Sequence, residues 1–327
     1  MVVTQAVSYD RLFGASMDIQ ELLDALTAKS DEPLISDTAD FIEFLSTEAV
    51  THSTDPFSRL VTAALRAGSQ ANATIAGHQS AIRRLFPSTP ADAVTAFCVS
   101  ESKGPHPRFI NTQLGETGGQ LHITGEKMWG TMAPAASLLY VAASTGVVDG
   151  QNQLAMVGID TGSPGITEIP LPPERQAGAV PICDLTFEQT PVYGNHVFPG
   201  DAYTTYIKPF RLIEDVFSTV AMQIGLFRLG SGTGLSHDLR EDLIGLIIQG
   251  HAVAASNMDS SGALLLITSY LRASQEHWAK MRETWAQADP SIGPHWHADG
   301  KILTVAAKAR ATRRETAWRN LGENLDS

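Results

Sequence analysis

The sequence predicts an α+β protein in which a middle β-domain (residues 95–205) separates an N-terminal helical domain (1–94) from a C-terminal helical domain (206–327). Apolar residues recur every three or four positions in the first and last of these ranges, as in amphipathic helices. In the middle range they alternate in short runs separated by Gly, Pro and Asn, as in strands joined by turns. The 327 residues are 43% hydrophobic, which is enough for a sizeable core. We therefore expect a β-sandwich or small β-barrel between two helical blocks.

The N-terminal domain begins with two predicted amphipathic helices in the stretch 17–48, within MDIQELLDALTAKS and SDTADFIEFLSTEAV. Each has an Asp or Ser near its start, where a side-chain oxygen can cap the first backbone N–H groups. The Ala-rich stretch 60–86 predicts one or two buried helices, closed by Pro87 and Pro90. The helical region should end near residue 94.

Six short runs in the middle domain predict strands: TAFCVS, QLHIT, LLYVAAS, QLAMVGID, CDLTFEQ and HVFPG. Among them, TGEKMWGTMA (124–133) places Trp129 and Thr131 two residues apart, and strand alternation predicts that both point to one face. This pair serves either chemistry or packing. In the packing interpretation, Trp129 is a core aromatic and Thr131 an ordinary strand residue.

Four later stretches return to the helical period: LIEDVFSTVAMQIGLFRL, EDLIGLIIQGHAVAASN, SGALLLITSYLRASQEHWAKMRETWAQ and KILTVAAKARATRRETAWRNL. The last of them carries Lys301, Lys308, Arg310, Arg313, Arg314 and Arg319. These cations either hold phosphates or an acidic partner, or form a solvated helix face. GSGTG (230–234) follows a helical run and lacks dinucleotide-loop spacing, so it predicts a break between helices. HWH (295–297) has no third ligand nearby, so we assign no metal.

The charge and cysteine content limit the classes of partner and compartment. A formal net charge of −12 argues against nucleic acid and against an anionic membrane surface. Cys98 and Cys183 lie far apart, which indicates neither a disulfide framework nor a zinc site and fits the reducing cytoplasm. The N-terminus does not resemble a secretory signal, and the apolar stretches are interrupted before membrane-spanning length. We expect a cytoplasmic protein that acts on small molecules or binds other proteins, with no membrane insertion.

Two segments of the middle domain resemble the flavin-facing strands of the acyl-CoA dehydrogenase family. They are AFCVSE (96–101) and LHITGEKMWGTMAPAASLLYVAAST (121–145), and their spacing is similar to the family's. The later run PLPPERQAGAVPICDLTFEQTPV resembles the family's closing strand. The resemblance implies the family's fold, with an N-terminal helical domain, a middle β-domain and a C-terminal helical bundle that is shortened here.

The resemblance also implies FAD as the cofactor and assigns five residues to it. By position, Trp129 packs against the isoalloxazine ring and the Thr131 hydroxyl lies near its N5 atom. Phe97, Val99 and Ser100 supply backbone and hydroxyl contacts to the pyrimidine edge. Such donors stabilise charge on a reduced ring, and an aromatic side chain excludes water from one face.

The family reaction, part of lipid metabolism, is α,β-dehydrogenation of an acyl-CoA thioester, and it needs a carboxylate base. The family's late-helix Glu is absent, but some members place a Glu ten residues before a Gly in an earlier helix. Gly225 takes that place here, and Asp215 stands ten residues before it beside Glu214. Asp215 is therefore the candidate base. The alternative is that both acids interact with a helix N-terminus.

The sequence departs from the family where phosphates are bound. The family's Pro-Gly-x-Gly-Ser loop is replaced by SKGPHPRF (102–109), in which Pro105 and Pro107 remove backbone N–H donors. Gly130 replaces a β-branched residue, which loosens the strand or permits a close backbone approach.

The leading hypothesis is an oligomeric flavoprotein oxidoreductase that takes an acyl-CoA substrate and passes electrons to an electron-accepting flavoprotein or another acceptor. Two alternatives stay open. One is a non-catalytic partner subunit of a heteromeric acyl-CoA dehydrogenase, and the other is a related flavin-dependent monooxygenase.

Overall fold

The computed structural model describes residues 17–49, 55–176, 178–230, 235–288 and 307–322. These residues pack into two compact units. The helical unit takes its described residues from 1–34, 52–87 and 213–327, and the β-unit takes them from 35–51 and 88–212. The three domains expected from the sequence remain a prediction, whereas the two units group every described N-terminal helix except that of residues 38–47 with the C-terminal helices.

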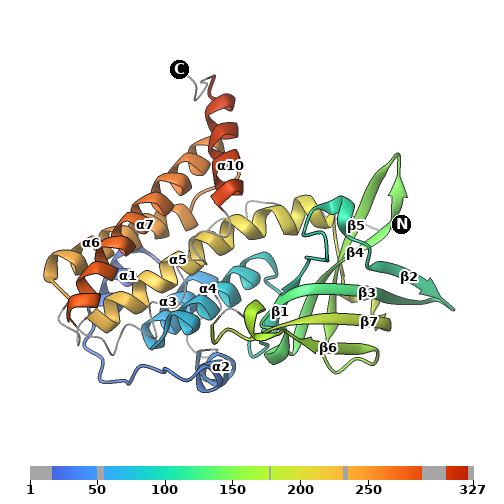
Figure 1. Cartoon of the computed structure of the whole chain (residues 1–327), viewed down its shortest axis with the longest axis horizontal. Helices are drawn as coiled ribbons and strands as arrows, with labels where there is room; N and C mark the ends of the chain where they lie inside the picture. Colours follow the sequence, from blue (N-terminus) through green and yellow to red (C-terminus); the bar gives the residue numbers. More distant parts are fainter. Residues whose placement is uncertain (1–16, 50–54, 177, 231–234, 289–306, 323–327) are drawn as a thin grey trace. The chain divides into compact units, whose positions relative to one another are not determined.

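The helical unit contains α1 (Ile19–Thr27), α3 (Pro56–Arg66), α4 (Gln70–Leu85), most of α5 (Lys208–Gly230), α6 (His237–Ala254), α7 (Ser261–Ala288) and α10 (Ala307–Asn320). Figure 1 labels them along the colour gradient. Their first turns explain why they start where they do. The Asp18 side chain accepts from the Glu21 N–H and the Glu21 side chain accepts from the Asp18 N–H, so the two form a capping box.

Helix α4 is the most buried helix of its unit, with 14 of its 16 residues buried. Gly77 explains how it packs, because a Cβ there would lie 2.4 Å from the Ser218 Cα of α5. The 60–86 stretch predicted as one or two helices is two, α3 and α4, and the second ends just before Pro87. Thus a glycine lets two helix backbones approach closely at the centre of the unit.

The β-unit contains α2 (Thr38–Thr47), capped by Asp37, and one mixed sheet of eight strands. The strands are β1 (Thr95–Cys98), β2 (Gln113–Thr117), β3 (Gln120–Thr131), β4 (Leu138–Val148), β5 (Gln151–Asp160), β6 (Ile166–Pro170), β7 (Ile182–Val192) and β8 (Val197–Phe198). Their order is β6-β7-β3-β2-β4-β5-β8, and β1 pairs in parallel with β4 (Figure 1). All six runs predicted as strands lie at least partly in strands, and β2 and β6 are additional.

The core of the β-unit contains both cysteines of the chain. Cys98 of β1 and Cys183 of β7 lie among buried side chains that include Ile123, Leu139 and Phe187. Both are free thiols, and burial raises the pKa of each to about 12. They are therefore protonated and unreactive at neutral pH.

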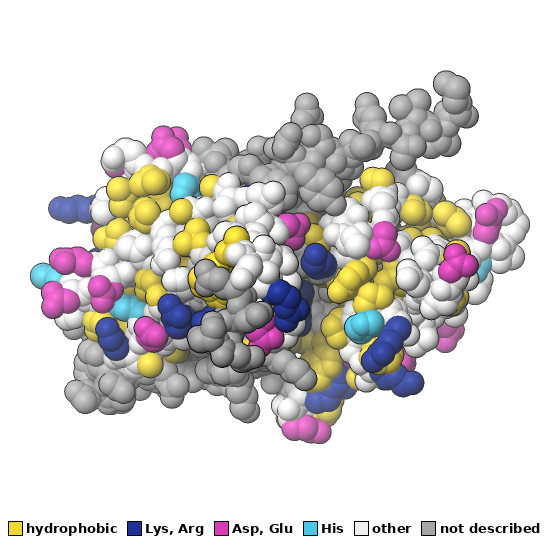
Figure 2. Space-filling view, turned by 90° about the horizontal axis from the view of Figure 1, so that it is seen from above, with side chains coloured by type: hydrophobic (Ala, Val, Ile, Leu, Met, Phe, Trp, Pro, Cys, Tyr) yellow, Lys and Arg dark blue, Asp and Glu magenta, His cyan; other side chains and the backbone are white. Residues whose placement is uncertain are grey.

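Charges of both signs lie interspersed with hydrophobic side chains on the face drawn in Figure 2. No helix among the described residues combines the length and apolar character needed to cross a bilayer.

Candidate functional site

Strand β3 carries a bulge where the sequence reads MWG. Lys127 pairs with Leu185 and Gly130 with Cys183, so Met128 and Trp129 together face the single residue Asp184 of β7. A Cβ at Gly130 would lie 3.0 Å from the Ala133 Cβ and 3.1 Å from the Cys183 carbonyl oxygen. Gly130 therefore permits a close backbone approach. The bulge interrupts the regular alternation on which the shared face of Trp129 and Thr131 was predicted.

Trp129 lies in the bulge with a left-handed backbone, at φ 60°, which is unusual for a bulky residue. Its N–H donates to Asp184 Oδ1 at 2.9 Å. Asp184 also accepts a two-pronged pair of hydrogen bonds from Arg175, at 2.9 and 3.1 Å. The Arg175 guanidinium lies over the indole, 4.3 Å from the ring centroid. Trp129 nevertheless keeps 47% of its surface exposed.

The two segments that carry the family resemblance lie side by side. The Ser100 carbonyl accepts a hydrogen bond of 2.8 Å from the Met128 N–H, next to Trp129. Lys127 Nζ donates to the Val99 carbonyl at 3.4 Å. The main chain of residues 99–100 thus runs beside the bulge.

The other predicted flavin contacts lie in the same unit. Phe97 and Val99 are buried, and the Phe97 ring packs against Phe210 with centroids 4.3 Å apart. Thr131 is half-buried and pairs with Ile182 of β7. The Phe97 side chain is engaged in packing, so a ligand contact at this residue falls to its main chain.

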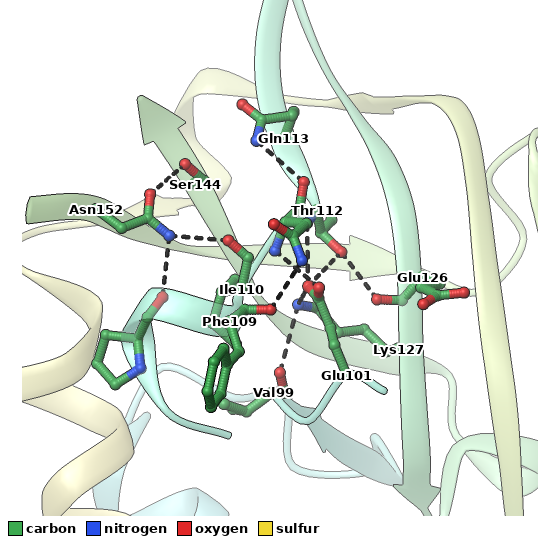
Figure 3. A network of polar contacts seen from close by, with 12 residues as sticks. Val99, Glu101, Phe109, Ile110, Thr112, Gln113, Glu126, Lys127, Ser144 and Asn152 are labelled. Carbon is green, nitrogen blue, oxygen red and sulfur yellow. Dashed lines mark hydrogen bonds and ion pairs between the residues drawn. The ribbon is translucent and has the colours of Figure 1, made fainter. Parts of the chain in front are cut away.

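A buried ion pair joins the same two segments (Figure 3). Lys127 is 0% exposed, and its Nζ donates to Glu101 Oε1 at 2.7 Å. Glu101 also accepts from the N–H and hydroxyl of Thr112 and from the Asn111 N–H. Glu101 Oε1 accepts three of these four hydrogen bonds and Oε2 accepts the one from Asn111. The pair therefore fixes three chain segments in the interior of the β-unit.

The pKa of Glu101 reflects this arrangement. Burial by itself would raise it, but the Lys127 ammonium and the hydrogen bonds from Lys127, Thr112 and Asn111 outweigh burial. The pKa of Glu101 is consequently below its ordinary value, and the group is ionised at neutral pH. Glu101 and Lys127 both lie in the segments that resemble the family, but the sequence pattern did not predict that they pair.

The loop that follows Glu101 takes the place of the family's phosphate loop, and it is held at two points. The first is a tight turn in which the Gly104 N–H donates to the Glu101 carbonyl at 2.8 Å. At the second, the Asn152 side chain donates to the carbonyls of Pro107 and Ile110, as Figure 3 shows. Between these points Arg108 is exposed and stacks over Phe109, at 4.5 Å from its centroid. The loop is ordered by its own contacts and presents a cation where the family presents glycine N–H groups.

Asp215, the candidate base, belongs to the helical unit. It lies on α5 and contacts two arginines of α10: Arg313 Nη2 is 3.1 Å from its Oδ2, and Arg310 Nη1 is 3.6 Å from its Oδ1. Its side chain is 17% exposed. Burial raises the pKa of Asp215 above its ordinary value, and the two guanidinium groups offset this only in part. The carboxylate is thus partly desolvated, as a base must be, but both of its oxygens face cations.

The neighbouring acid has a different partner. Glu214 forms a hydrogen bond with His78 of α4, whose Nδ1 lies 2.7 Å from Glu214 Oε1. Neither acid lies in the first turn of α5, which contains no acidic residue. The alternative role at a helix N-terminus therefore does not fit the structure, because helix α5 begins seven residues before Asp215.

Within the described ranges, no group of three or more His, Cys, Asp or Glu side chains is placed to hold a metal ion. Helix α5 ends at Gly230, the first residue of the GSGTG segment. Residues 231–234, the HWH segment and Lys301 lie outside the described residues.

The residues of the β-unit fit the aromatic ring of a flavin cofactor better than they fit its pyrophosphate. An exposed indole in a fixed bulge, beside the main chain of residues 99–100, suits contact with a ring such as isoalloxazine. The 102–110 loop suits a pyrophosphate less well, because Pro105 and Pro107 lack N–H groups. Ring binding by this unit is thus better supported than phosphate binding.

No protein-family model and no curated protein sequence matches the chain. Solved structures do match. Butyryl-CoA dehydrogenase from Megasphaera elsdenii has a TM-score of 0.65 at 13% identity, covering 92% of this chain and 98% of that one. A structure described as an FAD-dependent dehydrogenase has a TM-score of 0.66 at 11% identity, covering 98% and 100%. A glutaryl-CoA dehydrogenase from Mycobacterium smegmatis in complex with FADH2 has a TM-score of 0.54 at 14% identity, covering 96% and 97%. At these identities the likeness establishes the fold, and the chain has an acyl-CoA dehydrogenase-like fold.

Proposed function

We propose that this chain is an FAD-dependent oxidoreductase that removes hydrogen from the α and β carbons of an acyl-CoA thioester. The observation that carries the proposal is Trp129, an exposed indole held in a left-handed bulge beside the main chain of residues 99–100. Strained backbone that the surrounding contacts maintain is concentrated at functional sites. Similar structures include a dehydrogenase in complex with FADH2, which supports FAD as the ligand of this surface.

The proposal assigns Phe97, Val99, Ser100, Trp129 and Thr131 to the flavin ring. The carbonyls and N–H groups of residues 97–100 would bind its polar edge, Trp129 would shield one face from water, and the Thr131 hydroxyl would donate a hydrogen bond. When bound, FAD supplies the acceptor for the β-hydrogen of the substrate.

Asp215 is the proposed acceptor of the α-proton. Its raised pKa makes it a stronger base than an exposed Asp, and its contacts with Arg310 and Arg313 fix its orientation. One oxygen must turn away from its arginine to reach the substrate. We propose that acyl-CoA binding accompanies this rearrangement. A cytoplasmic location, an oligomeric state and an electron-accepting flavoprotein partner belong to the same proposal.

The test is an absorbance spectrum of the purified chain with and without FAD, followed by acyl-CoA addition. Bound oxidised flavin that bleaches with an acyl-CoA is the expected result. Asp215→Asn should reduce the bleaching rate at least a hundredfold, whereas the neighbouring Glu214→Gln serves as the matched control and should bleach within a fewfold of wild type. Undiminished bleaching in Asp215→Asn would remove the base assignment, and a chain that takes up no FAD would remove the function.

A second candidate, the non-catalytic partner subunit, is favoured by the same Asp215 cluster and by the 102–110 loop. In that role the two arginines neutralise a carboxylate that no longer acts as a base, and a partner chain supplies phosphate binding. Co-purification with a related, longer chain that binds FAD would support this candidate, and an active homo-oligomer would exclude it.

A further inference from the structure

Trp129, Arg175 and Asp184 form a closed ring of three contacts in the β-unit. The Trp129 main chain donates to Asp184, Asp184 pairs with Arg175 through both carboxylate oxygens, and the Arg175 guanidinium lies over the Trp129 indole. Arg175 comes from the short 3₁₀ turn Pro173–Arg175 between β6 and β7, whereas the other two lie on paired strands. Strand β3, through the Trp129 N–H, and the turn, through Arg175, thus both bind the Asp184 side chain of β7.

The ring of contacts explains how an unfavourable backbone is maintained. A left-handed conformation at a bulky residue is strained, and the surrounding structure must offset that strain. The Asp184 carboxylate provides a charge-assisted hydrogen bond to the Trp129 N–H. The Arg175 fork keeps that carboxylate in place, because its two parallel hydrogen bonds define the planes of both groups.

The same contacts decide which surface of Trp129 is available. The guanidinium lies over one face of the indole, so a ring that stacks on Trp129 must use the opposite face, and the residue as a whole keeps 47% of its surface exposed. A tryptophan that served only for packing would have no need of a dedicated cation, a carboxylate and a strained main chain while leaving so much of its surface in solvent.

We infer that Arg175 and Asp184 are positioning residues that hold the Trp129 indole as a rigid stacking surface for a planar aromatic ring. The inference rests on the proposed function for the identity of that ring, the isoalloxazine of FAD. It adds two residues that lie outside the two flavin-facing segments, in the run that resembles the family's closing strand. Preorganisation reduces the entropic cost of binding. Loss of Arg175 or Asp184 should therefore weaken FAD binding even where Trp129 itself is unchanged.

The experiment uses the full chain labelled with 5-fluorotryptophan. The chain has five tryptophans, and Trp129→Phe identifies the ¹⁹F resonance of Trp129 by its disappearance. Ligand-free Arg175→Met and Arg175→Lys are compared with wild type, and FAD affinity is measured for each by quenching of flavin fluorescence. Arg240→Met is the matched control, because Arg240 lies over the Phe227 ring of the helical unit, 4.8 Å from its centroid, and has no role in the proposed FAD site. Thermal unfolding confirms that each variant is folded.

The expected result is a shifted or broadened Trp129 resonance in both Arg175 variants and an FAD affinity about tenfold weaker, with neither change in Arg240→Met. Lysine keeps the charge but not the planar fork, so Arg175→Lys distinguishes positioning from simple electrostatics. An unchanged Trp129 resonance in Arg175→Met, or full FAD affinity in Arg175→Lys, would overturn the inference. Failure of wild type to bind FAD would instead overturn the proposed function, and the ligand-free resonance decides between the two failures.

Discussion

The Glu101–Lys127 pair of the β-unit and the Asp215 cluster of the helical unit (Asp215, Arg310 and Arg313) are both salt bridges, yet they differ in completeness. Around Glu101, three further hydrogen bonds come from Thr112 and Asn111, and Lys127 is wholly buried. Asp215 keeps 17% of its side chain exposed and meets arginines whose own side chains are 15% and 23% exposed. The fully buried Glu101–Lys127 pair stabilises the fold, whereas the partly exposed Asp215 cluster retains a carboxylate that can change partners.

The largest expected effect comes from breaking the closed pair. Lys127→Met leaves Glu101 buried without its cation, and we expect it to lower the free energy of unfolding by about 3 to 5 kcal/mol. Urea denaturation measures this. The control is Arg66→Met, which removes a pair with the exposed Glu32 and should cost at most about 1 kcal/mol. Equal losses in the two variants would contradict the distinction between closed and open pairs.

A second prediction compares how tightly the two units are packed at glycine. Gly77→Ala places a Cβ 2.4 Å from a backbone atom of α5, whereas Gly130→Ala places one 3.0 Å from the Cβ of Ala133. We expect Gly77→Ala to cost about 1 to 3 kcal/mol, as overpacking does, and Gly130→Ala to cost less. Urea midpoints of both variants, measured by circular dichroism, check the order. A reversed order would mean that the helices adjust more easily than the bulge.

Loss of one partner from the Asp215 cluster should cost less stability than loss of Lys127 from the Glu101–Lys127 pair. Arg313→Gln removes the nearer cation from Asp215, and because the pair is partly exposed we expect a loss of about 1 kcal/mol at neutral pH. The loss should shrink as pH falls through the pKa of Asp215, since the protonated carboxyl gains little from a cation. Unfolding curves at several pH values measure it. A loss that is constant with pH would show that Arg313 acts through packing alone.

The smallest effect is the acid dependence of the closed pair. The pKa of Glu101 is lowered in the folded state, so its contribution to stability is present above its ordinary value of 4.5 and is lost as pH falls through the lower folded value. Glu101→Gln should therefore flatten the stability profile below about pH 4.5, relative to wild type. Parallel profiles for the two proteins would assign the acid sensitivity to other carboxylates.

Local signals in the sequence predicted much of the secondary structure. Asp18 and Asp37 cap the first two helices, and Pro87 follows the end of α4. The β2–β3 hairpin was not predicted, although Gly118 and Gly119, with φ of 61° and 81°, form the two-residue turn that joins its strands. A search for paired glycines between alternating runs would have found it.

The candidate site was harder to predict, because its contacts join distant residues. The family resemblance brought Trp129 and Ser100 together, but Asp184, which stabilises the Trp129 backbone, lies 55 residues further along the chain. Arg313 lies 98 residues from Asp215, and His78 lies 136 residues from Glu214. No periodicity encodes such pairs, and the bulge breaks the very alternation used to assign faces.

The location of the two cysteines gives the protein a built-in probe. Both thiols lie in the core of the β-unit, and their raised pKa values suppress alkylation while the sheet is closed. The helical unit contains none, since the chain has only these two. The rate at which a thiol reagent labels the unmodified protein therefore measures how often the sheet opens, independently of the helices and without any engineered label.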